Sequence, residues 1–129
     1  MTKGNEMVTT PTAAGLVSEH VAHLGYLGEF DKASAVTDGL KPEAFAGFAI
    51  FTSHGVVQGS WGLPGCTPNS VVMVSIAEVQ ISPEGQVVPI LGDAPCVVQN
   101  VVPGTDSLSI RCYVGWTSDL TCRLNVFMA

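Results

Sequence analysis

Three histidines are the first residues of this sequence whose chemistry suits metal binding or proton transfer: His20, His23 and His54. His20 and His23 are three residues apart, so on a helix they would face the same way and could share a metal ion. A third ligand would have to come from Glu19, Glu29 or His54, and no spacing typical of a zinc site supports that. We therefore expect surface histidines and no metal site.

Nucleophilic catalysis would need a serine, a histidine and an acid that the fold brings together. His54 and Asp93 can be combined with many serines, but the sequence contains no G-x-S-x-G motif. His54-Gly55 is better explained as a turn, with glycine supplying a positive φ. A catalytic triad is therefore not expected.

Paired carboxylates for glycoside hydrolysis would have to stand on strand ends that face a cleft. From residue 42 onward most acids fall in turns instead: Glu84, Asp93, Asp106 and Asp119. Gly62 and Gly65 flank Pro64 in a loop between strands, so they do not form a phosphate-binding loop that opens a helix. The sequence thus predicts no catalytic residue, no cofactor and no enzymatic activity.

The two tryptophans, Trp61 and Trp116, are suited to stacking on a sugar or to packing against a partner. Trp116 ends an alternating apolar series, so we expect it in the core. Trp61 lies beside Gly59 and Gly62 and is the better candidate for an exposed platform that binds a partner.

Four cysteines, Cys66, Cys96, Cys112 and Cys122, are separated by 30, 16 and 10 positions. No C-x-x-C pair occurs, so neither a zinc ribbon nor a thioredoxin-type site is indicated. We expect free thiols that pack as small hydrophobic side chains, with Cys66 and Cys96 unbridged. The alternative is a bridge between Cys112 and Cys122, which adjacent strands would bring together.

Composition narrows the choice of partners. Hydrophobic residues make up 47% of the chain and charged residues only 12%, against about 25% charged in ordinary soluble domains. Such a surface is expected to be covered in part by other proteins. The net charge is −6 and the five cations are scattered, so neither nucleic acid nor an anionic membrane is an expected partner. The polar start lacks the apolar stretch of a signal peptide, which favours synthesis in the cytoplasm as a soluble protein.

From residue 42 onward the chain consists mainly of Val, Ile, Phe, Thr and Ser, interrupted by Gly and Pro. Turn signals recur every 8–12 residues across about seven strands, which predicts an all-β fold, an antiparallel β-sandwich of jelly-roll type. No helical segment separates the strands, as a parallel α/β sheet would require. The expected strands are residues 45–53, 56–61, 70–81, 86–91, 96–102, 107–116 and 120–128.

Alternating apolar and polar residues predict two hairpins. One joins residues 107–116 to 120–128, with Cys112 and Cys122 both on the core face. The other joins 45–53 to 56–61 through His54-Gly55. The strand 120–128 is expected to lie inside a sheet or to be covered by a neighbour.

The first third of the chain is polar and rich in alanine. Residues 1–15 predict a flexible N-terminal arm, and residues 16–129 a single sandwich domain. Apolar residues from Leu16 to Leu24 recur at helical spacing, so a short helix is one alternative and a strand through 20–30 is another; we favour an extended arm with some local structure. Met7 and Val8 are the apolar side chains of the arm that would be buried against a partner.

Residues 87–129 contain the segment NVVPG, a tryptophan in GWTSDL and a final strand LTCRLNVFM. This stretch resembles the small decoration, or cement, proteins of tailed-bacteriophage capsids, which have a jelly-roll or C1q/tumour-necrosis-factor-like sandwich. The resemblance covers the last third of the chain and, more loosely, the middle third.

The resemblance implies a structural virion protein on the capsid exterior that binds the major capsid protein and stabilises the shell. It also implies a homo-oligomer, a dimer or trimer, whose weak contacts add up through avidity. The alternatives are an H-type-lectin-like carbohydrate-binding module and a receptor-binding fibre head, and no ligand residues of those lectins can be placed in this sequence.

Overall fold

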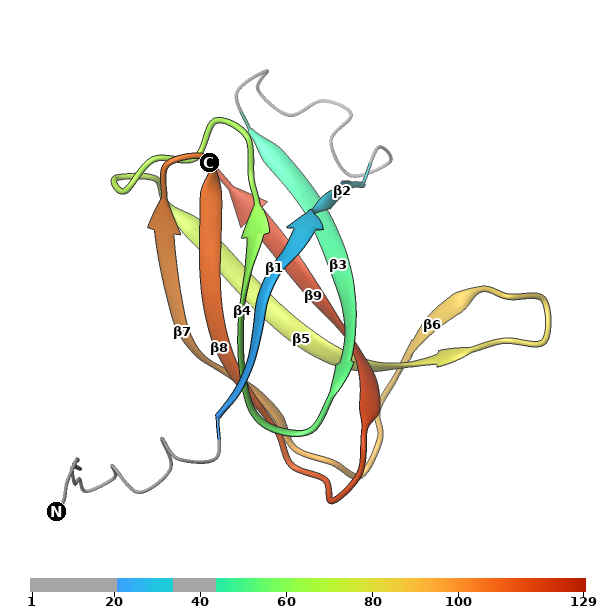
Figure 1. The fold of residues 1–129 in the computed structure, drawn as a ribbon. Coiled ribbons are helices and arrows are strands. Elements are labelled where there is room, and N and C mark those ends of the chain that lie inside the picture. The colour runs from blue at the N-terminus through green and yellow to red at the C-terminus, as the bar shows by residue number, and fades with distance from the viewer. Residues whose placement is uncertain (1–20, 34–43) are drawn as a thin grey trace, which may run out of the picture.

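Strand-forming residues dominate the part of the chain that the computed structural model describes, residues 21–33 and 44–129. Of these residues 68% lie in strands and none in a helix, so the predicted all-β class is confirmed. Two sheets pack face to face (Figure 1). The predicted arm, with Met7 and Val8, and also His20 lie outside the described residues.

Nine strands are formed by the described residues. The four-stranded sheet has the order β1 (Ala22–Glu29), β4 (Gly55–Gly62), β8 (Ser107–Val114), β7 (Cys96–Gly104). The five-stranded sheet has the order β2 (Asp31–Lys32), β3 (Phe45–Ser53), β9 (Leu120–Met128), β5 (Val72–Ile81), β6 (Val87–Ile90). As predicted, β9 is an interior strand, paired on one side with β3 and on the other with β5.

The N-terminal part of the described chain is a strand and not a helix. β1 pairs with β4 in parallel, while the other neighbours in both sheets are antiparallel. The alternative of a strand through residues 20–30 is therefore confirmed over Ala22–Glu29, and the sandwich is antiparallel except at this edge.

Both predicted hairpins are wrong. β3 and β4 follow one another in sequence but belong to different sheets, and the same holds for β8 and β9. Alternation identifies the face of a strand that points inward, but that face is the same whether the next strand lies beside it or across the core. The sharp corner at Gly55 does need glycine, whose φ is +73°.

The hairpins that do form are β5–β6 and β7–β8. The turn of the second hairpin contains Asp106, which has a positive φ of 55°. The Gly65 amide donates a hydrogen bond to the Asp106 carboxylate at 3.0 Å, and the Asp106 amide donates to the Cys66 carbonyl at 2.8 Å. Asp106 therefore does more than make a solvated turn, because it fastens this hairpin to the loop between β4 and β5.

The inner faces of both sheets make the core, and Trp61 lies in it with an exposure of 2%. Its indole stacks on Phe30, with 5.7 Å between ring centroids. The expected exposed platform at Trp61 is thus wrong. A Cβ atom on Gly59 would lie 3.3 Å from the indole, so the glycine makes room for the buried ring.

Trp116 was expected in the core and lies on the surface instead, with an exposure of 46%. β8 ends at Val114, so the inward series stops before Trp116 and no longer determines where its side chain points. The two tryptophans have thus exchanged the places expected for them.

Candidate interaction surfaces

The outer face of the five-stranded sheet carries a groove. Strands β3, β9 and β5 lie side by side there, and their register places Phe48 and Ser75 on either side of Asn125. Ala46 and Met73 flank Phe127 in the same way. The space between these side chains has a volume of about 610 Å³. We name it the outer-face groove and define it by Phe48, Met73, Ser75, Arg123, Asn125 and Phe127.

The walls of the outer-face groove are apolar. Met73 is 68% exposed, Phe127 is also exposed, and Phe48 is half-buried beside them. Single apolar side chains are ordinary on protein surfaces, but a contiguous group of them marks a binding site. The groove therefore offers a partner apolar surface to cover.

A fixed row of polar groups crosses the same groove. The Arg123 Nε donates a hydrogen bond to the Asn125 side-chain oxygen at 3.0 Å, and the Asn125 amide donates to the Ser75 hydroxyl at 3.2 Å. The Arg123 guanidinium lies 5.5 Å from the centroid of the Phe48 ring, within cation–π range. A positive charge is thus held in place within an apolar surround, where it would favour an acidic group of a partner.

The β5–β6 hairpin projects from the body of the sandwich (Figure 1). Ile81 is 59% exposed and Val88 is 42% exposed, and Val87, which pairs with Ile81 in the register, is also exposed. The turn is closed by the Gly85 amide, which donates to the Ser82 carbonyl at 2.8 Å, and by the Gln86 amide, which donates to the Ser82 hydroxyl at 3.0 Å. The projecting hairpin is therefore a well-formed element with apolar side chains in solvent.

A third apolar area lies at one end of the sandwich. Trp116 and Tyr113 line a hollow of about 380 Å³ together with Gly115 and Thr117. The Gly115 amide donates to the Pro95 carbonyl at 2.8 Å, which holds the loop after β8 against the start of β7. The sequence pattern did not predict this area, because alternation continues through Trp116 whereas β8 ends at Val114.

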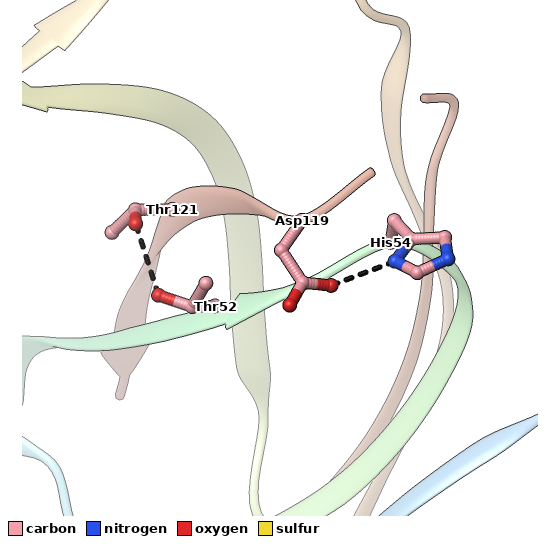
Figure 2. Close-up of polar contacts among 4 residues, drawn as sticks. All are labelled: Thr52, His54, Asp119 and Thr121. Carbon is pink, nitrogen blue, oxygen red and sulfur yellow. Dashed lines mark hydrogen bonds and ion pairs between the residues drawn. The ribbon is translucent and has the colours of Figure 1, made fainter. Parts of the chain in front are cut away.

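His54 has an acidic partner, although not the one expected. Its Nδ1 lies 2.7 Å from the carboxylate of Asp119, and not from that of Asp93 (Figure 2). Both side chains are exposed, and within the described ranges no serine hydroxyl is hydrogen-bonded to His54. The pair joins the β3–β4 corner to the loop between β8 and β9.

A second side-chain bond, between Thr52 and Thr121 at 2.9 Å, lies next to this pair (Figure 2). The two bonds therefore stabilise the end of the β3–β9 pairing. The arrangement is not one that would activate a nucleophile.

His23 is exposed on β1. In residues 21–33 and 44–129, no three His, Cys, Asp or Glu side chains are grouped so that they could hold a metal ion.

The four cysteines are free thiols, as expected. Cys112 and Cys122 lie on different sheets, so they are not neighbours within a hairpin. Burial raises the pKa of Cys112 to about 11 and that of Cys122 to about 12. Burial also raises the pKa of Cys96, although a hydrogen bond with Cys122 acts in the opposite direction. These three thiols stay protonated near neutral pH, which makes them poor nucleophiles.

Comparisons of the chain with protein-family models, with curated proteins and with solved structures gave no match. No helix long and apolar enough to cross a membrane is found in the described part of the chain. The fold and the surfaces together define an all-β sandwich that carries an apolar groove, a projecting hairpin and an aromatic end.

Proposed function

We propose that this protein is a structural virion protein that binds the assembled capsid of a tailed bacteriophage from outside and stabilises the shell. The observation that carries the proposal is the gathering of exposed apolar side chains on the outer-face groove and the projecting hairpin. Met73, Ile81 and Val88 are all largely exposed there.

These side chains are not needed to complete the core. The inner faces of the two sheets already bury large residues from both sheets, among them Trp61, Leu108 and Leu124. A monomer that leaves further apolar groups in water at ordered positions gains nothing in stability from them. A subunit of an assembly would cover them, and the resemblance of residues 87–129 to capsid decoration proteins suggests which assembly.

A shell also suits a small subunit with weak individual contacts. Many identical positions on a capsid let such contacts act together, and linked sites can exceed a single affinity by about 10²–10⁴. The low charge of the chain, 12% of its residues, favours broad contact with a protein surface over attraction to nucleic acid.

The test is co-sedimentation of the full chain with purified shells of the phage that carries its gene. We expect saturable binding with a copy number set by the shell lattice, and a higher temperature of shell disruption. Unassembled major capsid protein is the control and should bind much more weakly. Absence of the chain from the sedimented shells at micromolar concentration would refute the proposal.

The same co-sedimentation assay also tests whether the N-terminal arm contributes to attachment. Deletion of residues 1–12 removes Met7 and Val8, and we expect weaker attachment to shells with an unchanged thermal melt. Equal binding of the shortened chain would show that the arm makes no contact and that the attachment lies on the sandwich.

Carbohydrate binding is the second candidate function, favoured by the exposed ring of Trp116 beside Tyr113. Sugars stack on such rings, and a glycan bound there would change the fluorescence of Trp116. Titration of the protein with a glycan panel tests this, and Trp116→Ala should abolish any signal. If no glycan of the panel gives a response, carbohydrate binding is rejected and shell binding is the remaining candidate function.

A further inference from the structure

The projecting hairpin and the outer-face groove have complementary properties. The exposed side chains of the hairpin strands are largely aliphatic: Ile81 and Val87 pair with each other and share one face, and Val88 lies on the opposite face. The groove has a volume of about 610 Å³, within the range of about 300–1,000 Å³ typical of ligand pockets. The groove is therefore large enough to receive several aliphatic side chains.

The charges of the two surfaces are also complementary. Glu84 lies exposed in the turn of the hairpin, and residues 79–91 contain no other charged side chain. Among the described residues that line the groove, Arg123 is the charged one and none is acidic. Opposite charges at matching places on two surfaces select partner and orientation.

A hairpin cannot fill the groove of its own copy. Met73 lies near the start of β5 and Ile81 at its end, and eight residues of extended strand span roughly 26 Å. β5 is held along this length by its pairing with β9 and β6. The strand therefore keeps the hairpin away from its own groove, so a hairpin that enters this groove has to come from a second copy.

Side chains, and not backbone, provide the contact. The outer strand of the hairpin, β6, contains Pro89, which pairs with Val79 and has no amide proton to give a further strand. Proline on an edge strand discourages strand-to-strand addition. The hairpin is thus built to enter a concave surface and not to extend a sheet.

We propose that the projecting hairpin of one copy of this chain docks into the outer-face groove of a second copy, with Glu84 approaching Arg123. This deepens the proposed function by naming the surface through which its copies associate. Each copy gives a hairpin and receives one, so two copies that exchange hairpins form a two-fold dimer, and a head-to-tail arrangement forms a ring if the rotation closes.

The first test is the mass of the purified full chain by light scattering and sedimentation, without shells. We expect an oligomer that dissociates on dilution. A hairpin variant, Ile81→Asp with Val87→Asp, changes the paired residues of one face. This variant and a groove variant, Met73→Asp, should each be monomeric. Val102→Asp on β7 is the matched control, exposed on the other sheet, and should leave the oligomer intact.

Mixing the two monomeric variants is the decisive step. The hairpin variant keeps a working groove and the groove variant keeps a working hairpin, so a mixture should form one heterodimer and nothing larger. A mixture that stays monomeric, or a native chain that is monomeric at all concentrations, would overturn the inference. So would oligomers that either variant leaves unchanged.

Charge reversal provides a second measurement that does not alter the apolar contact. Glu84→Arg and Arg123→Glu should each weaken self-association by about tenfold, and the double variant should recover most of that loss. Equal losses that simply add would overturn the pairing of these residues. Circular dichroism and a thermal melt show that each variant is folded.

The outcome is separable from that of the shell experiment. A chain that binds shells yet stays monomeric alone would refute the docking of hairpin and groove while leaving the proposed function intact. A chain that forms the predicted oligomer but does not bind shells would do the reverse.

Discussion

The two sheets of the sandwich each carry one outward arginine near the middle of a central strand, and the two arginines differ in their surroundings. Arg111 on β8 donates from Nε and Nη2 to the side-chain oxygen of Gln58, at 3.1 and 3.0 Å. Arg123 on β9 donates to Asn125 and lies over the ring of Phe48. One guanidinium is satisfied by a polar neighbour and the other is set in an apolar groove.

The surroundings extend this difference. Around Arg111 the outer face presents three polar side chains and one exposed apolar one: Gln58, Ser109, Asn100 and Val102. Around Arg123 it presents Phe48, Met73 and Phe127. The inner faces of the two sheets are alike, since both bury large apolar residues completely. The difference therefore arises on the solvent side, where folding imposes little and binding to a partner can decide which residues are present.

Core truncation in each sheet has the largest expected effect. Leu108 on β8 and Leu124 on β9 are both fully buried, so Leu108→Ala and Leu124→Ala should each lower the free energy of unfolding by about 2–5 kcal/mol. Chemical denaturation measures both. A loss of unfolding free energy in only one of the two variants would mean that the inner faces of the sheets differ as well as the outer faces.

Alkaline pH should destabilise the protein through Cys112 and Cys122, one from each sheet. Their folded pKa values, about 11 and about 12, lie above the ordinary value of 9.0, so the folded state holds protons that the unfolded state has lost. Stability is therefore complete below about pH 9 and falls as the pH rises towards 11–12. A pKa unit corresponds to about 1.4 kcal/mol, which gives a loss on the order of 3 kcal/mol for Cys112.

Unfolding free energies measured from pH 8 to pH 11 would show this decline. Cys112→Ala and Cys122→Ala are the controls and should each flatten it. If one alanine variant keeps the pH dependence of the native protein, the replaced thiol does not contribute to it. Water would then reach that thiol in the folded state.

Replacement of each arginine by lysine probes the outer faces directly and should produce effects of about 1 kcal/mol or less. Arg111→Lys loses the two-pronged donation to Gln58, which the single ammonium group does not reproduce. Its expected cost is about 1 kcal/mol. Arg123→Lys retains a cation over Phe48 and should cost less than about 0.5 kcal/mol. The reverse order of costs, measured by thermal and chemical denaturation, would contradict the description of the two faces.

Trp116→Ala should have the smallest effect. The side chain is exposed and lies outside both outer faces, so the free energy of unfolding should change by less than about 0.5 kcal/mol. Trp61→Ala provides the contrast, with an expected loss of about 3–5 kcal/mol. A large loss at Trp116 would show that the aromatic end supports the core.

The inner faces of the strands could be predicted from the sequence. Alternation in β8 and β9 correctly identified Leu108, Ile110, Leu124 and Val126 as core residues, because a strand has only two faces and water selects the polar one. The same pattern did not reveal to which sheet a strand belongs. Both proposed hairpins therefore failed, although their strands were placed within a few residues.

The outer-face groove could not be predicted for a related reason. Its walls come from β3, β5 and β9, which meet only through pairings between distant parts of the chain. Phe48 and Met73 are unremarkable in their own strands, and their register against Asn125 and Phe127 makes the groove. The prediction of an exposed Trp61 failed for a local reason. Glycine beside a large ring can make space for a buried ring as well as leave the ring exposed.

The central place of β9 also has a consequence for how the protein folds. β9 pairs with β3 along its whole length, from Phe45 with Met128 to Ser53 with Leu120, and these partners are far apart in the chain. Such long-range pairing makes folding slow, on a scale of milliseconds to seconds for comparable β-domains. Until β9 is inserted, β3 and β5 both present open edges, which attract other unfinished chains. The yield of native protein should therefore depend on concentration during refolding, since insertion of β9 competes with aggregation.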